Sequence, residues 1–96
     1  MDAQLEIMKK LLIESYREWL ERNRELLGED GYRRFMSRIQ HLSSANAQTV
    51  IVYVLNIVGT YLMTAVANGT CVNVDRESTE KLMKWIHIVA LHLSTW

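Results

Sequence analysis

The sequence predicts a small all-α protein in which four helices are arranged around a buried, apolar third helix. Residues 39–74 contain no Asp, Glu, Lys or Arg, and within this stretch residues 49–67 have apolar side chains on nearly every side of a helix. A helix of this kind must be covered by other helices or by lipid. The flanking segments show apolar residues at three- and four-residue steps, which is the spacing of one helical face. A length of 96 residues predicts one domain, residues 1–96.

The first predicted helix covers residues 2–27 and presents one broad apolar face. That face comprises Leu5, Ile7, Met8, Leu11, Leu12, Tyr16, Trp19, Leu20 and Leu26. Gly28 follows where a left-handed residue commonly ends a helix, so we predict the first turn at residues 28–31. A shorter second helix begins near Asp30. Its buried stripe is predicted to be Tyr32, Phe35, Met36, Ile39 and Leu42.

Turn and capping residues set the bounds of the last two helices. Ser44 or Asn46 is placed to cap the third helix, which ends before Gly69. Residues 70–75 are predicted to form a short extended or hairpin element. Asp75 then caps the fourth helix. The buried stripe of that helix is predicted to be Leu82, Trp85, Ile86, Val89, Leu93 and Trp96.

Charge and cysteine content limit the functional classes. The formal charge is zero, from 11 basic and 11 acidic residues, which excludes a polybasic tail. The single cysteine, Cys71, cannot form an intrachain disulfide, and the first residues lack the features of a signal peptide. We therefore expect a cytoplasmic protein. A small membrane protein spanning with residues 49–67 is a weaker alternative, because Asn56 lies at mid-span and neither end is closely flanked by Lys or Arg.

The titratable residues show no pattern of an active site. His87 and His92 are five residues apart, about 140° around a helix, so they do not converge on one ion. His41 is distant in sequence, and Cys71 lies in an apolar run with no neighbouring histidine. No Cys-x-x-Cys or His-x-x-x-His spacing is present. The sequence therefore predicts a protein that is not an enzyme, with no catalytic residue, metal site or cofactor.

A basic run without acidic residues lies at positions 32–41. Arg34, Arg38 and His41 recur there at i, i+4 and i+7, and arginine is well suited to bidentate contact with phosphate. The candidate nucleic-acid-binding residues are Arg33, Arg34, Arg38 and His41. A solvated face or a protein-contact surface explains the same run equally well.

Two tryptophans indicate a protein partner. Trp96 is the last residue, and Trp85 lies on a helix already rich in apolar groups. A chain this small with this much apolar surface does not hide all of it alone. We therefore predict Trp85 and Trp96 at an interface with copies of the chain or with a larger assembly.

The segment that begins at Arg38 resembles a known family. It reads Arg-Ile-Gln-His-Leu-Ser-Ser-Ala-Asn-Ala-Gln-Thr-Val-Ile-Val-Tyr. Its Arg-Ile, Leu-Ser, Ala and Tyr spacing is similar to that of the small subunit of type I-A CRISPR effector complexes. Those proteins are short and mostly helical, and some have a small extended element in the place that residues 71–74 would occupy. The match covers about a sixth of the chain, and Val, Leu and Asn56 replace charged residues expected around the central helix.

The resemblance implies a non-catalytic subunit of an RNA-guided CRISPR interference complex. Such a subunit would pack against other subunits and contact the backbone of the target or displaced DNA strand through Arg33, Arg34 and Arg38. The alternative from a different class is a helical homo-oligomeric interaction or adaptor module that binds no nucleic acid. Neither interpretation includes a small-molecule substrate.

Overall fold

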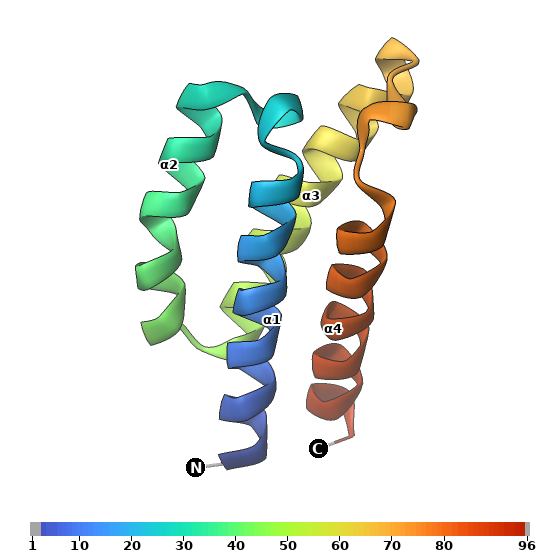
Figure 1. Ribbon diagram of the computed structural model, residues 1–96. Helices are drawn as coiled ribbons and strands as arrows, with labels where there is room; N and C mark the ends of the chain where they lie inside the picture. The colour runs from blue at the N-terminus through green and yellow to red at the C-terminus, as the bar shows by residue number, and fades with distance from the viewer. Residues whose placement is uncertain (1–2, 96) are drawn as a thin grey trace.

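The computed structural model describes residues 3–95 and shows an all-α fold (Figure 1). Its elements are α1 (Ala3–Arg22), α2 (Arg24–Ser44), α3 (Ala47–Asn68), the short 3₁₀ helix η1 (Cys71–Asn73) and α4 (Arg76–Ser94). The predicted fold class is confirmed, and each long helix lies in a segment where one was predicted.

The chain reverses direction at Gly28, as predicted, but residues 29–31 are helical rather than part of a turn, and helix α1 ends earlier than expected. α1 stops at Arg22, and after Asn23 residues 24–27 form one further helical turn. Gly28 then takes φ 76° and ψ 160°, a conformation that interrupts helix α2 with a kink. Glycine adopts positive φ at little steric cost, so the chain reverses direction here. The remainder of α2 runs back alongside α1 (Figure 1).

The predicted capping residues act at three helix ends. Asn46 Oδ1 accepts a hydrogen bond from the Thr49 N–H at 2.8 Å at the start of α3, and Gly69 ends that helix with φ 68°. Asp75 Oδ2 accepts from the Ser78 N–H at 3.0 Å at the start of α4. These hydrogen bonds to Ser78 lower the pKa of the Asp75 carboxyl, because they stabilise its charged form.

The predicted extended element at residues 70–75 is wrong. This segment contains η1, in which the Asn73 N–H donates to the Thr70 carbonyl at 2.9 Å and the Val74 N–H donates to the Cys71 carbonyl at 3.1 Å. No strand occurs anywhere in residues 3–95, so an extended piece here would have no partner for its backbone groups. Tight local hydrogen bonds satisfy those groups instead.

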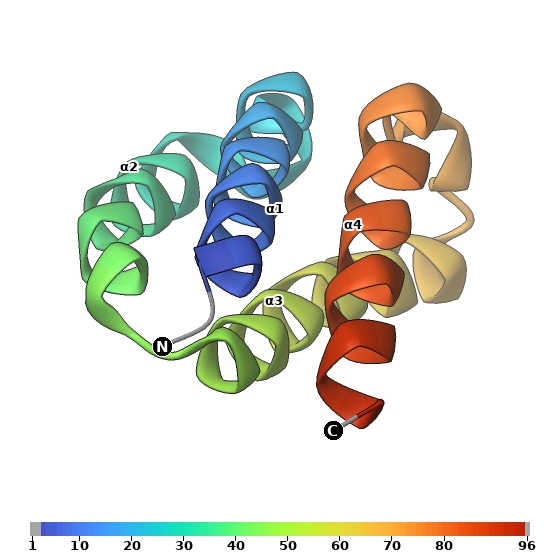
Figure 2. The ribbon, with the colours of Figure 1, turned by 90° about the horizontal axis from the view of Figure 1, so that it is seen from below.

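Helix α1 lies at the centre of the molecule. Figure 2 shows α2, α1 and α4 in one row, with α3 crossing on one side of the row. The most extensive contact joins α1 to α4, which run antiparallel (Figure 1). The largest fully buried side chains of α1 are Leu12, Tyr16, Trp19 and Leu20. The core is therefore organised around the amphipathic first helix.

The prediction that α3 is a buried helix is correct for one face only. Val50, Val54 and Val58 are fully buried against the other helices. The opposite face is exposed, with Val52, Leu55, Met63 and Val66 from 41% to 72% exposed. The apolar composition of α3 predicted that other helices would cover it on every side. In the described residues, the other helices cover only one side.

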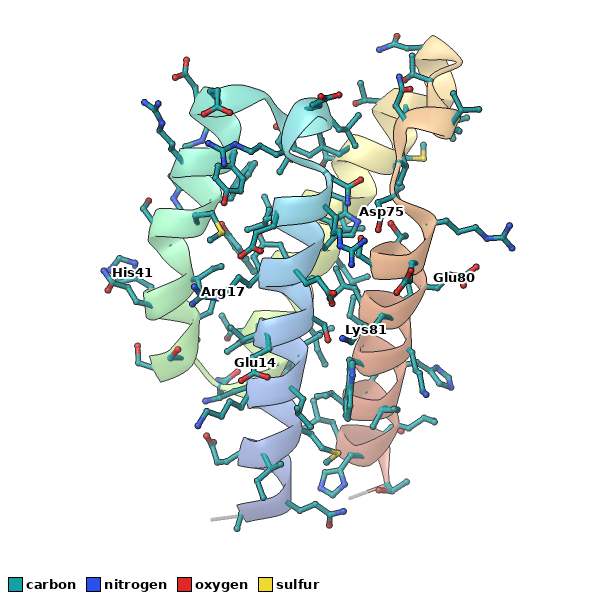
Figure 3. All side chains as sticks on the ribbon, in the orientation of Figure 1. Glu14, Arg17, His41, Asp75, Glu80 and Lys81 are labelled. Atoms are coloured by element: carbon teal, nitrogen blue, oxygen red, sulfur yellow. The ribbon has the colours of Figure 1, made fainter. Side chains whose placement is uncertain are left out.

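A partly buried polar cluster centred on the buried Asn23 joins the end of α1 to the start of α4. Asn23 Nδ2 donates to the Trp19 carbonyl at 2.8 Å, and Asn23 Oδ1 accepts from the Asp75 N–H at 2.8 Å. Trp19 Nε1 donates to Thr79 Oγ1 at 2.9 Å. At the surface nearby, Lys81 reaches from α4 to Glu18 of α1, with an Nζ–Oε2 distance of 3.0 Å (Figure 3). These contacts fix the α1–α4 pair at the end opposite the chain termini.

Lys9 holds the corner between α2 and α3. Its side chain is nearly buried, and its ammonium donates to the Ser43 carbonyl at 3.2 Å and to the Ala45 carbonyl at 2.9 Å. Glu6 lies 3.1 Å from the same ammonium. A cation suits this position because the last carbonyls of a helix lack partners within the helix and carry partial negative charge.

Candidate interaction surfaces

The exposed side of α3 forms a continuous apolar surface. Its members, which we call the uncovered face of α3, are Val52, Leu55, Gly59, Met63 and Val66. Met63 is 72% exposed, Val66 65%, Val52 55% and Leu55 41%. Contiguous exposed apolar patches on proteins commonly mark a surface that another molecule covers.

The threonines beside this face add little polarity to it. Thr60 Oγ1 donates to the Asn56 carbonyl at 2.6 Å, and Thr64 Oγ1 donates to the Thr60 carbonyl at 2.8 Å. Both hydroxyl protons are therefore satisfied inside the helix, as occurs when Ser or Thr bonds back to the preceding turn. Covering this side of α3 leaves neither hydroxyl donor without a partner.

Helix α4 borders the uncovered face along the first half of α3. A shallow groove between the two helices is lined by Gln48, Ile51, Val52, Ala90, Leu93 and Ser94. None of these side chains is charged, so the uncharged surface extends from α3 onto the last turns of α4. The groove has no cluster of convergent polar groups of the kind that orients a small ligand.

Helix α3 also has the length and composition of a membrane-crossing helix. The range Ala47–Asn68 has a mean hydropathy of 2.0 over an 18-residue window, and 28% of that window is buried by the rest of the protein. Core helices of globular proteins can have the same length and composition. This property alone therefore does not decide between a protein partner and a lipid one.

The predicted basic residues all lie on α2, and three of them share one side. Arg34, Arg38 and His41 are exposed and fall within about 60° of one another around the helix, whereas Arg33 is about 100° away from Arg34. His41 points away from the bundle, and Arg17 extends from α1 toward α2 (Figure 3). We call Arg34, Arg38 and His41 the basic face of α2.

The ion pairs of α2 leave the basic face uncompensated. Glu29 binds Arg24, with an Nε–Oε1 distance of 2.7 Å, and this contact lowers the pKa of the Glu29 carboxyl. Glu29 also lies 3.9 Å from Arg33. Within residues 3–95, no carboxylate lies within ion-pair distance of Arg34 or Arg38; the Arg34 guanidinium instead stacks 5.3 Å from the centre of the Phe35 ring.

The two predicted interface tryptophans have different outcomes. Trp85 is half-buried and packs against the core from α4. Trp96 lies outside the described residues. The exposed apolar side chains of α3 were not among the predicted interface residues, because the sequence assigned them to the core. Their signal was present in the sequence, since a helix that is apolar all round needs covering on every side.

The titratable groups form no metal cluster in the part of the chain that the structure describes. His41 lies on α2, whereas His87 and His92 lie on α4. Cys71 is exposed on η1. Burial raises the pKa of the Tyr16 hydroxyl, and the neighbouring Tyr53 raises it further. The two rings meet edge to face, 6.1 Å apart, inside the core, where Tyr16 contributes to packing.

No family model, curated protein or solved structure matches the chain.

Proposed function

We propose that this protein is a non-catalytic helical subunit that binds another protein through the uncovered face of α3. The observation that carries this proposal is the row of exposed apolar side chains on a helix whose opposite face packs in the core. A core-facing helix needs one apolar side, so the second apolar side has no role within the described fold. Burying it against a partner removes that surface from water.

A charge-introducing double variant tests this proposal. Leu55→Glu with Met63→Glu should leave the fold intact, because both side chains are exposed, and should lower recovery of bound proteins at least about tenfold by burying unpaired charge. The measurement is quantitative pull-down of the tagged protein from a detergent-free lysate that also contains an untagged copy. The matched control is Ile7→Glu with Val72→Glu, at exposed apolar positions outside the α3 face. Equal recovery with both variants would contradict the proposal.

A second candidate function is contact with the backbone of a nucleic acid through the basic face of α2. The observation in its favour is that Arg34 and Arg38 are exposed and unpaired with carboxylates among the described residues. The resemblance of residues 38–53 to the small subunit of type I-A CRISPR effector complexes supports the same role. In such a complex, α3 would pack against neighbouring subunits and α2 would face the DNA strand.

Salt-dependent binding tests the phosphate contacts. Arg34→Glu with Arg38→Glu should weaken binding to single-stranded DNA about tenfold or more at low salt, and should reduce the slope of log K against log salt by about 1.4, or 0.7 per phosphate contact. Fluorescence anisotropy of a labelled oligonucleotide measures both quantities. Arg22→Glu with Arg76→Glu is the control, because it changes the net charge equally on other helices. An equal loss of affinity in the control would mean that net charge, and not the basic face of α2, determines DNA binding. Absence of binding by the unmodified protein would exclude this function.

A further inference from the structure

The uncovered face of α3 has a symmetric arrangement about Gly59. Leu55 and Met63 stand four residues before and after Gly59, and Val52 and Val66 stand seven residues before and after it. At 100° per residue, all four lie within about 40° of the direction of Gly59 around the helix. The apolar stripe therefore has the same spacing when it is followed in either direction.

Gly59 itself has no function inside the described fold. It lies within α3 without positive φ, and a Cβ added there would meet no atom within 4 Å. Glycine in a helix interior costs about 0.5–1 kcal/mol relative to alanine. A close approach of another backbone is the remaining use of a missing side chain, and Gly59 is at the centre of the exposed stripe.

We propose that the uncovered face of α3 binds the same face of a second copy, with the two α3 helices antiparallel and a two-fold axis passing at Gly59. This inference rests on the proposed function and names its partner. In a two-fold interface, a residue i that contacts j is matched by j contacting i. Here Met63 of each copy lies level with Leu55 of the other, Val52 lies level with Val66, and the two Gly59 backbones meet at the axis.

The chemistry of the face favours a second copy over an unlike, charged partner. Residues 39–74 contain no Asp, Glu, Lys or Arg, so pairing two copies of α3 buries no charged group of that helix; Arg76 and Glu80 lie beside Val66 at the edge of the face. The hydroxyl donors of Thr60 and Thr64 are already satisfied within each helix. Leu55 and Met63 lie about 40° to opposite sides of the direction of Gly59, so where Met63 of one copy is level with Leu55 of the other, the two side chains sit side by side and interdigitate.

The size of the face predicts a weak dimer. The uncovered face of α3 runs from Val52 to Val66, so the contact is about 21 Å long. One helix face with the adjoining last turns of α4 falls at the small end of specific interfaces. We therefore expect a dissociation constant in the micromolar range, and association tests belong at concentrations of about 100 μM.

Cysteine cross-linking tests the antiparallel register. In a Cys71→Ser background, Leu55→Cys and Met63→Cys are prepared as two separate proteins. In the antiparallel pair, two copies of position 55 lie about 12 Å apart along the helix, beyond the Cα separation of about 7 Å that a disulfide permits. Each protein alone should therefore cross-link poorly, whereas their equimolar mixture should give at least about tenfold more disulfide-linked dimer. Gly59→Cys should cross-link alone, since position 59 meets its own copy. Ile7→Cys on α1 should not cross-link.

The outcomes separate this inference from the proposed function. Cross-linking of each protein alone, without a gain in the mixture, indicates a parallel pair and overturns the antiparallel register. A monomer at about 100 μM by sedimentation, with no cross-link in any pairing, overturns the second copy. The Glu double variant still tests the proposed function in that case, because the pull-down detects any protein partner. Recovery of the protein from cells only in detergent overturns both.

Discussion

Replacing Trp19 with alanine should lower the free energy of unfolding by about 3–5 kcal/mol, the range found for removing a large aromatic side chain from a core. Trp19 is fully buried on the central helix α1. The substitution creates a cavity, and it also removes the donor that Thr79 Oγ1 accepts at 2.9 Å. For a domain of this size the loss is a large share of the total stability.

Urea denaturation followed by far-ultraviolet circular dichroism measures this effect at a fixed protein concentration. Trp19→Phe should cost less than Trp19→Ala, because the phenyl ring refills most of the space while the hydrogen bond to Thr79 is still lost. Trp85→Ala is the control for loss of an indole, and it should cost less than Trp19→Ala because Trp85 is half-buried. A change below about 1 kcal/mol for Trp19→Ala would mean that this ring is not part of the core.

Replacing Asn23 with leucine should lower the free energy of unfolding by about 1–3 kcal/mol, which is the usual cost of leaving a buried donor without an acceptor. Asn23 is 2% exposed, and its Oδ1 accepts from the Asp75 N–H at 2.8 Å. Leucine has a similar volume but cannot accept that hydrogen bond. The Trp19 carbonyl keeps the hydrogen bond from the Asn23 backbone N–H at 3.0 Å, so one group loses its partner.

The same denaturation measurement checks this prediction, and amide hydrogen exchange locates the damage. Protection should fall first in the opening turn of α4, because Asp75 is its capping residue. Asn68→Leu makes the identical chemical change at an exposed position and should alter stability by no more than about 0.5 kcal/mol. If the two variants are equally stable, the hydrogen bond from Asp75 does not contribute to the fold.

The local features of the fold could be predicted from the sequence. Gly28, Asn46, Gly69 and Asp75 act through the backbone within a few residues, so their effect depends little on the tertiary structure. Periodicity likewise identified the amphipathic α1, whose Leu12, Tyr16 and Trp19 are in the core.

The features that depend on long-range contact could not be predicted. Asn23 reads as an ordinary polar residue of a helix, and its burial follows from the arrival of Asp75, 52 positions later. Lys9 reads as a surface lysine, and its burial follows from the position of Ser43 and Ala45. The exposed side of α3 was missed for the same reason, because the hydropathy of a helix does not state how many neighbours surround it.

The most extensive helix contact joins α1 to α4, which are far apart in sequence, and this has a consequence for folding. α1 and α4 meet through contacts such as Trp19 to Thr79 and Glu18 to Lys81, which span 60 and 63 positions. During synthesis the part of α1 that α4 covers therefore stays open until α4 leaves the ribosome. Synthesis adds about 5–20 residues per second, so this interval lasts seconds, whereas a single helix forms in about a microsecond. Until then the nascent chain exposes both the side of α1 that packs against α4 and the uncovered face of α3. The interval before α4 docks is therefore the step most vulnerable to aggregation.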